Sequence, residues 1–205
     1  MTNNNELKLF GKYTYEGIKI RDPSIAQVVS LKSIQIPHTY ARHANKQFAK
    51  QGVNVVERLI NKLMRGGTGE KTGGKIIRTH GKLQGKKTKA VKIVEKAFEI
   101  VARQTNQNPI QLLIMAIEHS APREEVTRVR LGGMAYQVAV DAGAQRRLDT
   151  ALRNITLAAI IQAFDKKNSV ADSLANEIIL ASKNSQDSFS VKRKNEAERM
   201  AKSAR

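Results

Sequence analysis

Residues 125–140, EVTRVRLGGMAYQVAV, decide the architecture, because they interrupt a chain that is otherwise patterned for helices. Apolar and polar side chains alternate along this stretch with a period of two, and many of its residues are β-branched, as in a β-strand. Gly132 and Gly133 stand near its centre, where a two-residue hairpin turn needs positive φ angles. The stretch predicts a β-hairpin that carries Arg128 and Arg130 on one face of its first strand.

On both sides of this hairpin, apolar residues recur at helical spacing. Three helix starts carry capping signals: Asp22 before Pro23, Asn108 before Pro109, and Ser169 with Asp172 as a capping box. The predicted helices cover residues 23–31, 38–50, 53–65, 89–104, 109–121, 145–164, 170–182 and, with only a thin apolar stripe, 191–204. The expected fold class is mainly α: a bundle of about six helices with one projecting β-hairpin arm, an N-terminal extension and a basic C-terminal tail.

Two further segments lack a helical pattern. Residues 7–20 alternate roughly and favour short strands, whereas residues 66–87 hold seven glycines among basic side chains and indicate a mobile basic loop or a loose ribbon. Gly66-Gly67 is expected to end the preceding helix. The predicted organisation has three parts. These are an N-terminal extension (1–37), a helical domain (38–190) that includes the loop 66–87 and the hairpin 125–140, and a basic tail (191–205).

The charge of the 205-residue chain is strongly positive and unevenly placed. Its 36 Lys and Arg residues outnumber 18 Asp and Glu residues, for a net charge of +18. The excess is +5 over residues 1–50, +8 over 51–90 and +4 over 191–205, while the middle hundred residues are almost neutral. A neutral, apolar-patterned centre with basic flanks indicates a core whose surface binds a polyanion, with nucleic acid as the expected class.

Nothing in the sequence assembles an active site. There is no cysteine, and the four histidines share no metal-ligand spacing, so neither a metal nor a cofactor is expected. Gly69, Gly74 and Lys75 approach the spacing of a phosphate-binding P-loop, but Ile76 stands where a magnesium-binding Ser or Thr belongs. The polar N-terminus and the short apolar runs exclude a signal peptide and a membrane span, which leaves an intracellular, non-catalytic binding protein.

Folded RNA is the favoured polyanion. Proteins that bind single strands stack bases on aromatic side chains, and only 9 of these residues are aromatic. Tyr136 on the arm is the one exposed stacking candidate. The main alternative is a DNA-architectural protein, since a helical body with a basic β-arm also bends duplexes. Gly132-Gly133 at the tip lacks the apolar wedge of such proteins, and competition between junction RNA and duplex DNA separates the two hypotheses.

Arg146 and Arg147 open a predicted helix, where cationic charge opposes the helix dipole unless an anion docks there. The basic segments before the neutral centre and the arm supply the remaining candidates for phosphate contacts. These are Arg42, Lys46, Lys75, Arg78, Lys86 and Lys87 before the centre, and Arg123, Arg128 and Arg130 at the base and along the arm.

Several stretches in combination resemble the universal small-subunit ribosomal protein seven family. They are NPIQLLIMAIE (108–118), SAPREEVTRVRLGGMAYQVAVD (120–141), QRRLDTALRNI (145–155), SLANEII (173–179) and the terminal KRKNEAERMAKSAR. The segments KLFGKYTYEGIKIRDPS and IPHTYARHANKQF resemble its archaeal and eukaryotic branch, and the long basic insert at 66–87 looks archaeal and has no counterpart in the short bacterial loop.

The resemblance implies a concrete role. Members of the family are helical bundles with a projecting hairpin that bind the 3′ major domain of 16S-type rRNA and nucleate assembly of the head of the small subunit. They lie in the cytoplasm at the subunit interface, near the tRNA exit site and the mRNA exit channel. The implied partners are therefore small-subunit rRNA, neighbouring ribosomal proteins and, at the exit site, tRNA and mRNA, with no membrane and no small-molecule substrate.

The resemblance also implies roles for matching residues. Arg128, Arg130, Gly132 and Gly133 correspond to the arm, and the tip with Tyr136 would lie near the tRNA exit site. The residues that the resemblance implies as rRNA contacts are Arg58, Lys62, Arg65, Arg146, Arg147, Lys192, Arg193 and Lys194.

Overall fold

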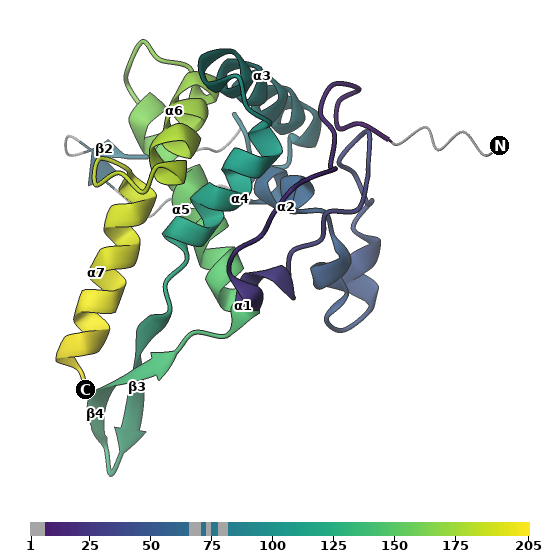
Figure 1. Cartoon of the computed structure of the whole chain (residues 1–205). Helices are drawn as coiled ribbons and strands as arrows, with labels where there is room; N and C mark the ends of the chain where they lie inside the picture. The colour runs from purple at the N-terminus through teal and green to yellow at the C-terminus, as the bar shows by residue number, and fades with distance from the viewer. Residues whose placement is uncertain (1–6, 66–70, 73–74, 78–81) are drawn as a thin grey trace.

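The computed structural model describes residues 7–65, 71–72, 75–77 and 82–205, and within them the chain is mainly helical (Figure 1). The helices are α1 (Pro23–Ala26), α2 (Val55–Leu63), α3 (Lys87–Thr105), α4 (Pro109–Ser120), α5 (Ala144–Ala163), α6 (Val170–Ser182) and α7 (Phe189–Ser203). Two 3-10 helices, η1 (Arg42–Asn45) and η2 (Ala49–Gly52), precede α2. The predicted fold class, a helical bundle with one hairpin arm, is confirmed.

The bundle is built around α6. Helices α3, α4 and α5 all contact α6, and α2 packs against α5 and α3. Phe98, Leu113 and Leu174 are completely buried in the shared core. Burying large apolar side chains from neighbouring helices is the main source of stability in such a bundle, at about 1.5–3 kcal/mol for each side chain. None of the described helices is long and apolar enough to cross a membrane.

The N-terminal segment packs on this core. Leu9 and Ile25 are fully buried in the same cluster, and the rings of Phe10 and Tyr13 meet Phe98 edge-on, with centroids 6.4 and 6.2 Å away. Residues 7–20 do not form the predicted strands. A single bridge joins Leu9 to Tyr13 around a tight turn, because the apolar residues here pack against α3 and no neighbouring strand is present in the described chain to complete a ladder.

The capping signals predict the helix starts correctly. Asp22 accepts hydrogen bonds from Ser24 N and Ile25 N, and Asn108 accepts one from Ile110 N at 3.0 Å. Ser169 and Asp172 form the reciprocal capping box. These contacts are local, so the sequence contains all the information they require.

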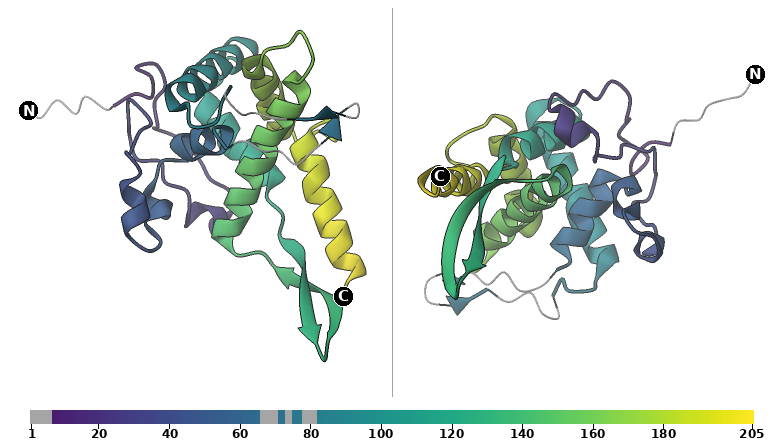
Figure 2. Two further views of the ribbon diagram at one scale, coloured as in Figure 1. Left: turned by 180° about the vertical axis from the view of Figure 1, so that it is seen from behind. Right: turned by 90° about the horizontal axis from the view of Figure 1, so that it is seen from below.

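The arm consists of β3 (Glu124–Leu131) and β4 (Met134–Asp141), and it projects from the bundle in Figure 1 and in the left-hand view of Figure 2. Leu131 pairs with Met134 across Gly132 and Gly133, whose φ angles of 56° and 84° make the predicted two-residue turn. The register places Val129 opposite Tyr136 on one face and Arg128 opposite Gln137 on the other.

Helices α5 and α7 hold the base of the arm. The Glu125 carboxylate accepts from Arg146 and from Thr150 of α5, while Glu124 pairs with Arg205 at the end of α7. Helix α7 lies alongside the arm (Figure 1) and contacts β3 and α5. Both Val191 and Ala201 are buried, so the predicted basic tail is a helix that packs against the rest of the molecule.

One buried carboxylate fixes the start of α7. Glu177 of α6 is completely buried. Its Oε1 accepts from Ser188 Oγ (2.7 Å), Ser190 N (2.9 Å) and Ser190 Oγ (2.8 Å), and its Oε2 accepts from Gln162 Nε2 (3.2 Å) and Phe189 N (3.4 Å). Two of these donors are backbone N–H groups of the first turn of α7, which have no partner within the helix.

Two predicted helices are wrong in extent or type. Helix α1 ends at Ala26 rather than at residue 31, because Val28 turns into the core and Ser30 accepts a hydrogen bond from Val55 N. Residues 38–50 form no α-helix. They make the two short turns η1 and η2, because this segment has no apolar stripe that could be buried against the bundle and hold a helix in place.

The glycine-rich segment contains a short ribbon in the part that the structure describes. Strands β1 (Lys71–Thr72) and β2 (Lys75–Ile76) pair antiparallel, and Ile77 is buried. Helix α3 begins at Lys87, which the sequence places at the end of the predicted loop 66–87. The predicted stop at Gly66-Gly67 and the candidate Arg78 lie outside the described residues.

Candidate nucleic-acid interface

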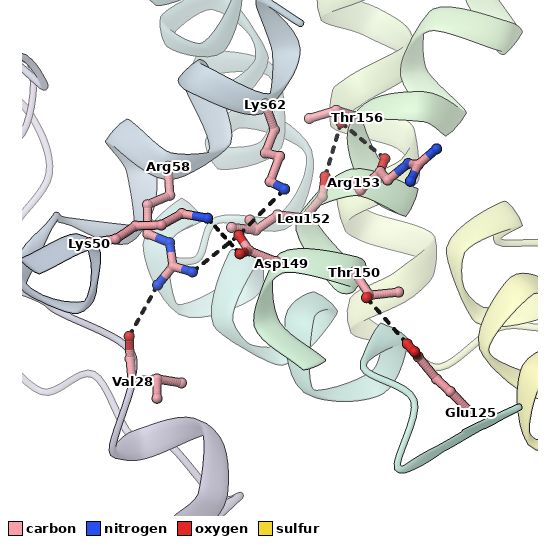
Figure 3. Close-up of polar contacts among 10 residues, drawn as sticks. All are labelled: Val28, Lys50, Arg58, Lys62, Glu125, Asp149, Thr150, Leu152, Arg153 and Thr156. Carbon is pink, nitrogen blue, oxygen red and sulfur yellow. Dashed lines mark hydrogen bonds and ion pairs between the residues drawn. The ribbon is translucent and has the colours of Figure 1, made fainter. Parts of the chain in front are cut away.

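Three basic side chains from two parts of the chain converge on one carboxylate. Lys50 Nζ lies 2.5 Å from Asp149 Oδ2, and Arg58 Nη2 and Lys62 Nζ lie 3.2 and 3.4 Å from Asp149 Oδ1. Figure 3 shows Lys50, Arg58 and Lys62 pointing toward Asp149, which stands on the N-terminal half of α5. This Asp149 cluster carries a net charge of +2.

The net charge of +2 allows the Asp149 cluster to attract a further anion. Burial lowers the pKa of Lys62, and the nearby charges of Lys50 and Arg65 lower it further, although Asp149 opposes the shift. Burial alone would raise the pKa of Asp149, but the Lys50 hydrogen bond and the charges of Lys62 and Arg58 hold it below its usual value. A phosphate beside this cluster would therefore relieve repulsion among the cations.

An open groove continues from the cluster to the base of the arm. It is lined by Lys62 of α2 and by Arg146, Asp149 and Arg153 of α5. A smaller pocket shares Lys62 and Asp149 with the groove, and its other lining residues include His43, Lys50 and Arg65. The structure thus brings the segment before α2, helix α2 and helix α5 together into one basic surface.

Sequence reasoning missed Lys50, Asp149 and Arg153 as members of this surface. Arg153 lies seven residues after Arg146, a spacing that returns to the same helix face, so the helical period was a signal that could have found it. Lys50 and Asp149 had no such signal, because they meet only in the folded chain across 99 positions.

Two of the expected rRNA contacts lie inside the protein. Arg58 is only 3% exposed, and its Nη1 donates to Val28 O at 3.2 Å. Arg147 is 7% exposed and pairs with Asp22 Oδ2 at 2.6 Å, while its Nε donates to Pro122 O. Arg147, one of the two cations that oppose the dipole of α5, is therefore neutralised by Asp22 and needs no docked anion. The other, Arg146, pairs with Glu125. The proposed interface therefore excludes Arg58 and Arg147.

Lys87 also has an internal partner. Its Nζ lies 2.6 Å from Oε1 of Glu57, a carboxylate that is completely buried on α2. The same carboxylate oxygen accepts from the backbone N and the Oγ1 of Thr39, at 2.9 and 3.0 Å. This contact fixes the segment before η1 to the start of α3.

The other candidates lie on the surface or partly on it. Arg193 is half-buried, over the Phe189 ring and 3.6 Å from Glu196, and Lys194 is half-buried too. Tyr136 is exposed and donates from its hydroxyl to Met134 Sδ. Only the backbone of Lys75 is described. The exposed candidates are Arg42, Lys46, Arg65, Lys86, Arg123, Arg128, Arg130, Arg146 and Lys192.

Acid should weaken the contacts that hold this surface together. Burial alone would raise the pKa values of Asp22 and Glu57, but hydrogen bonds from Arg147 and Lys87 respectively hold them below the ordinary values of 3.8 and 4.5. A lowered folded-state pKa stabilises the fold above the unfolded-state pKa, and this stability is lost as the pH falls through the folded-state value. Unfolding by urea should show a free energy that is level near pH 7 and falls below about pH 4.5.

The matched control for this titration is Asp22→Asn, which removes one of the titrating carboxylates. Its free energy of unfolding should be lower at pH 7 and should fall less steeply in acid than that of the unaltered chain. Equal acid slopes for the two chains would contradict the assignment of Asp22 as a stabilising carboxylate.

Comparison with known proteins gives one consistent family. Residues 26–205 match the family described as ribosomal protein S7p/S5e. The small ribosomal subunit protein uS7 of Methanothermobacter thermautotrophicus is 45% identical over 196 residues, which cover 96% of this chain and 98% of the relative. The small ribosomal subunit protein uS7 of Archaeoglobus fulgidus is 48% identical over 200 residues, covering 98% of this chain and 96% of the relative. Both relatives are archaeal, in agreement with the resemblance seen in the sequence.

Proposed function

This chain belongs to the ribosomal protein S7p/S5e family, and on that premise we propose that it binds the 3′ major domain of small-subunit rRNA and nucleates assembly of the head. Its role is structural rather than catalytic, as a constituent of the small subunit of the cytoplasmic ribosome. Its partners there are rRNA and neighbouring ribosomal proteins. The location at the subunit interface, beside the tRNA exit site and the mRNA exit channel, is part of the proposal.

The observation that carries the proposal is the basic surface from the Asp149 cluster to the arm. Its lysine and arginine side chains come from helices whose packing fixes their spacing, so the surface presents a preformed set of positive charges. Lysine and arginine contacts to phosphate release counterions and supply affinity without reading base sequence. A rigid pattern of such contacts selects a folded RNA by the positions of its phosphates.

The direct test is competition. The full chain should bind a transcript of the 3′ major domain in preference to an RNA of equal length from another domain and to duplex DNA, at physiological salt. Preference for duplex DNA would support the architectural alternative, for which Met134, exposed beside the turn, supplies an apolar tip that Gly132-Gly133 does not. Family membership favours rRNA. Failure of the chain to sediment with ribosomal particles would overturn the proposal.

The arm gives a sharper prediction. Replacing Arg128 and Arg130 together by alanine should leave the melting temperature unchanged, because both side chains are exposed on the face away from Val129 and Tyr136. The variant should bind the rRNA transcript more weakly, and the slope of log K against log salt should shrink by up to about two.

The matched control removes two charges elsewhere. Lys166 and Lys167 are exposed just beyond the C-terminal end of α5, at the opposite end of that helix from Arg146. Their double replacement by alanine should change the salt slope much less than the arm variant does. A salt slope of the arm variant equal to that of the unaltered chain would show that the arm makes no phosphate contact in this complex.

A further inference from the structure

Two large aromatic side chains stand in solvent within the segment before α2. Tyr40 is 76% exposed and Phe48 is 72% exposed, the highest values among the aromatic residues of this chain. Phe10, Tyr13 and Phe98 instead pack in or against the core. In a protein with only 9 aromatic residues, two such exposed rings in one short basic segment indicate a surface that is covered in the functional complex.

The backbone at both aromatic residues has an unfavourable conformation. Tyr40, Ala41 and Phe48 have φ angles of 50°, 57° and 59°, in the left-handed region that costs a residue with a Cβ roughly 1–2 kcal/mol. Strain of this kind persists where surrounding contacts fix it, and it gathers at binding sites. Here the contacts are those of Thr39 with the buried Glu57, directly before Tyr40.

The Tyr40 ring has a partner on one side and cations around it. The rings of His38 and Tyr40 lie 4.1 Å apart between centroids, and His38 Nδ1 accepts a hydrogen bond from Tyr40 N. Both residues line a hollow of about 610 Å³, and its other lining residues include Lys32, Arg42 and Lys46. An exposed ring beside a hollow with a cationic lining matches what an unpaired base and its flanking phosphates require.

We propose that Tyr40, backed by His38, is a stacking platform for an unpaired base of the bound RNA. Arg42 and Lys46 contact the phosphates beside that base, and Phe48 offers a second ring on the same segment. The inference rests on the proposed rRNA binding and adds a different chemistry to it, because stacking contributes affinity that does not depend on salt. The basic surroundings favour RNA over an apolar protein partner as the occupant.

Three substitutions test the platform with the full chain and the 3′ major domain transcript. Tyr40→Leu should weaken binding about 5- to 150-fold, the equivalent of one lost base stack, with the salt slope unchanged. Tyr40→Phe keeps the ring and should bind like the unaltered chain. Ile36→Ala removes a 71%-exposed apolar side chain nearby that has no ring, and it should also bind normally.

Irradiation of the unaltered complex provides a second measurement that needs no variant. Crosslinks should join Tyr40 or His38 to a base that is unpaired in the free transcript. Equal affinity of Tyr40→Leu and the unaltered chain, an equal loss in Tyr40→Phe, or an equal loss in Ile36→Ala would each overturn the platform. In those cases the unaltered chain still prefers the transcript, so rRNA binding itself stands. If the unaltered chain shows no such preference, it is the proposed function that fails.

Discussion

Replacing Glu177 by leucine should lower the free energy of unfolding by about 3–5 kcal/mol, because five hydrogen bonds lose their acceptor and the donors on Ser188 and Ser190 remain buried. Each buried donor left without a partner costs about 1–3 kcal/mol, partly offset by the apolar replacement. Two of these donors are backbone N–H groups in the first turn of α7. The helix should therefore lose its attachment to α6 before the bundle unfolds.

Urea denaturation measures the first part of this prediction and amide hydrogen exchange measures the second. Amides of α7 should exchange much faster in Glu177→Leu, while those of α3 and α4 stay protected. Glu177→Gln keeps one acceptor oxygen and should lose less stability. Glu196→Ala, at an exposed position of α7, is the control and should change stability by less than about 0.5 kcal/mol. Unchanged exchange in α7 would show that its attachment does not depend on Glu177.

Replacing Asp149 by asparagine should move stability and RNA binding in opposite directions. The free energy of unfolding should fall by about 3 kcal/mol, because Arg58 is buried and loses the charge that neutralises it. The Asp149 cluster should at the same time attract phosphate more strongly, since its net charge rises from +2 to +3. At a temperature where both chains are fully folded, the variant should bind the rRNA transcript at least as tightly as the unaltered chain.

A double variant separates the buried pair from the exposed part of the cluster. Arg58→Met together with Asp149→Leu replaces the buried Arg58 and its half-buried partner by apolar side chains and should recover most of the lost stability. A double-mutant cycle on the two positions gives their coupling free energy. A coupling near zero, or weaker RNA binding by Asp149→Asn at a temperature where it is folded, would contradict the assigned role of Asp149.

The features that the sequence predicts well are those decided by neighbouring residues. Asp22, Asn108 and Ser169 cap helices through residues two or three positions away, and Gly132-Gly133 sets the hairpin register on its own. The helix expected over 38–50 is wrong because such a helix depends on an apolar stripe buried elsewhere in the fold, and this segment has none to bury.

The candidate interface was less predictable, because charge alone does not say whether a side chain is exposed. Arg58 and Arg147 look like any other cation in the sequence, yet their carboxylate partners are 91 and 125 positions away. The stacking platform could not be predicted from the sequence either, because the fold decides which aromatic side chains are exposed. Tyr40 counts as one of a few scattered aromatics until the folded chain shows that most of the others are covered.

The bond between Asp22 and Arg147 also bears on the order in which the protein folds during its own synthesis. Asp22 leaves the exit tunnel 125 residues before its partner, and the four-residue helix that it caps is too short to persist alone. Joining Asp22 to Arg147 brings parts of the chain together that are far apart in sequence, and such a closure slows folding. The bond between Asp22 and Arg147 therefore forms only after α5 has emerged, and it completes the surface on which the groove and the base of the arm are built.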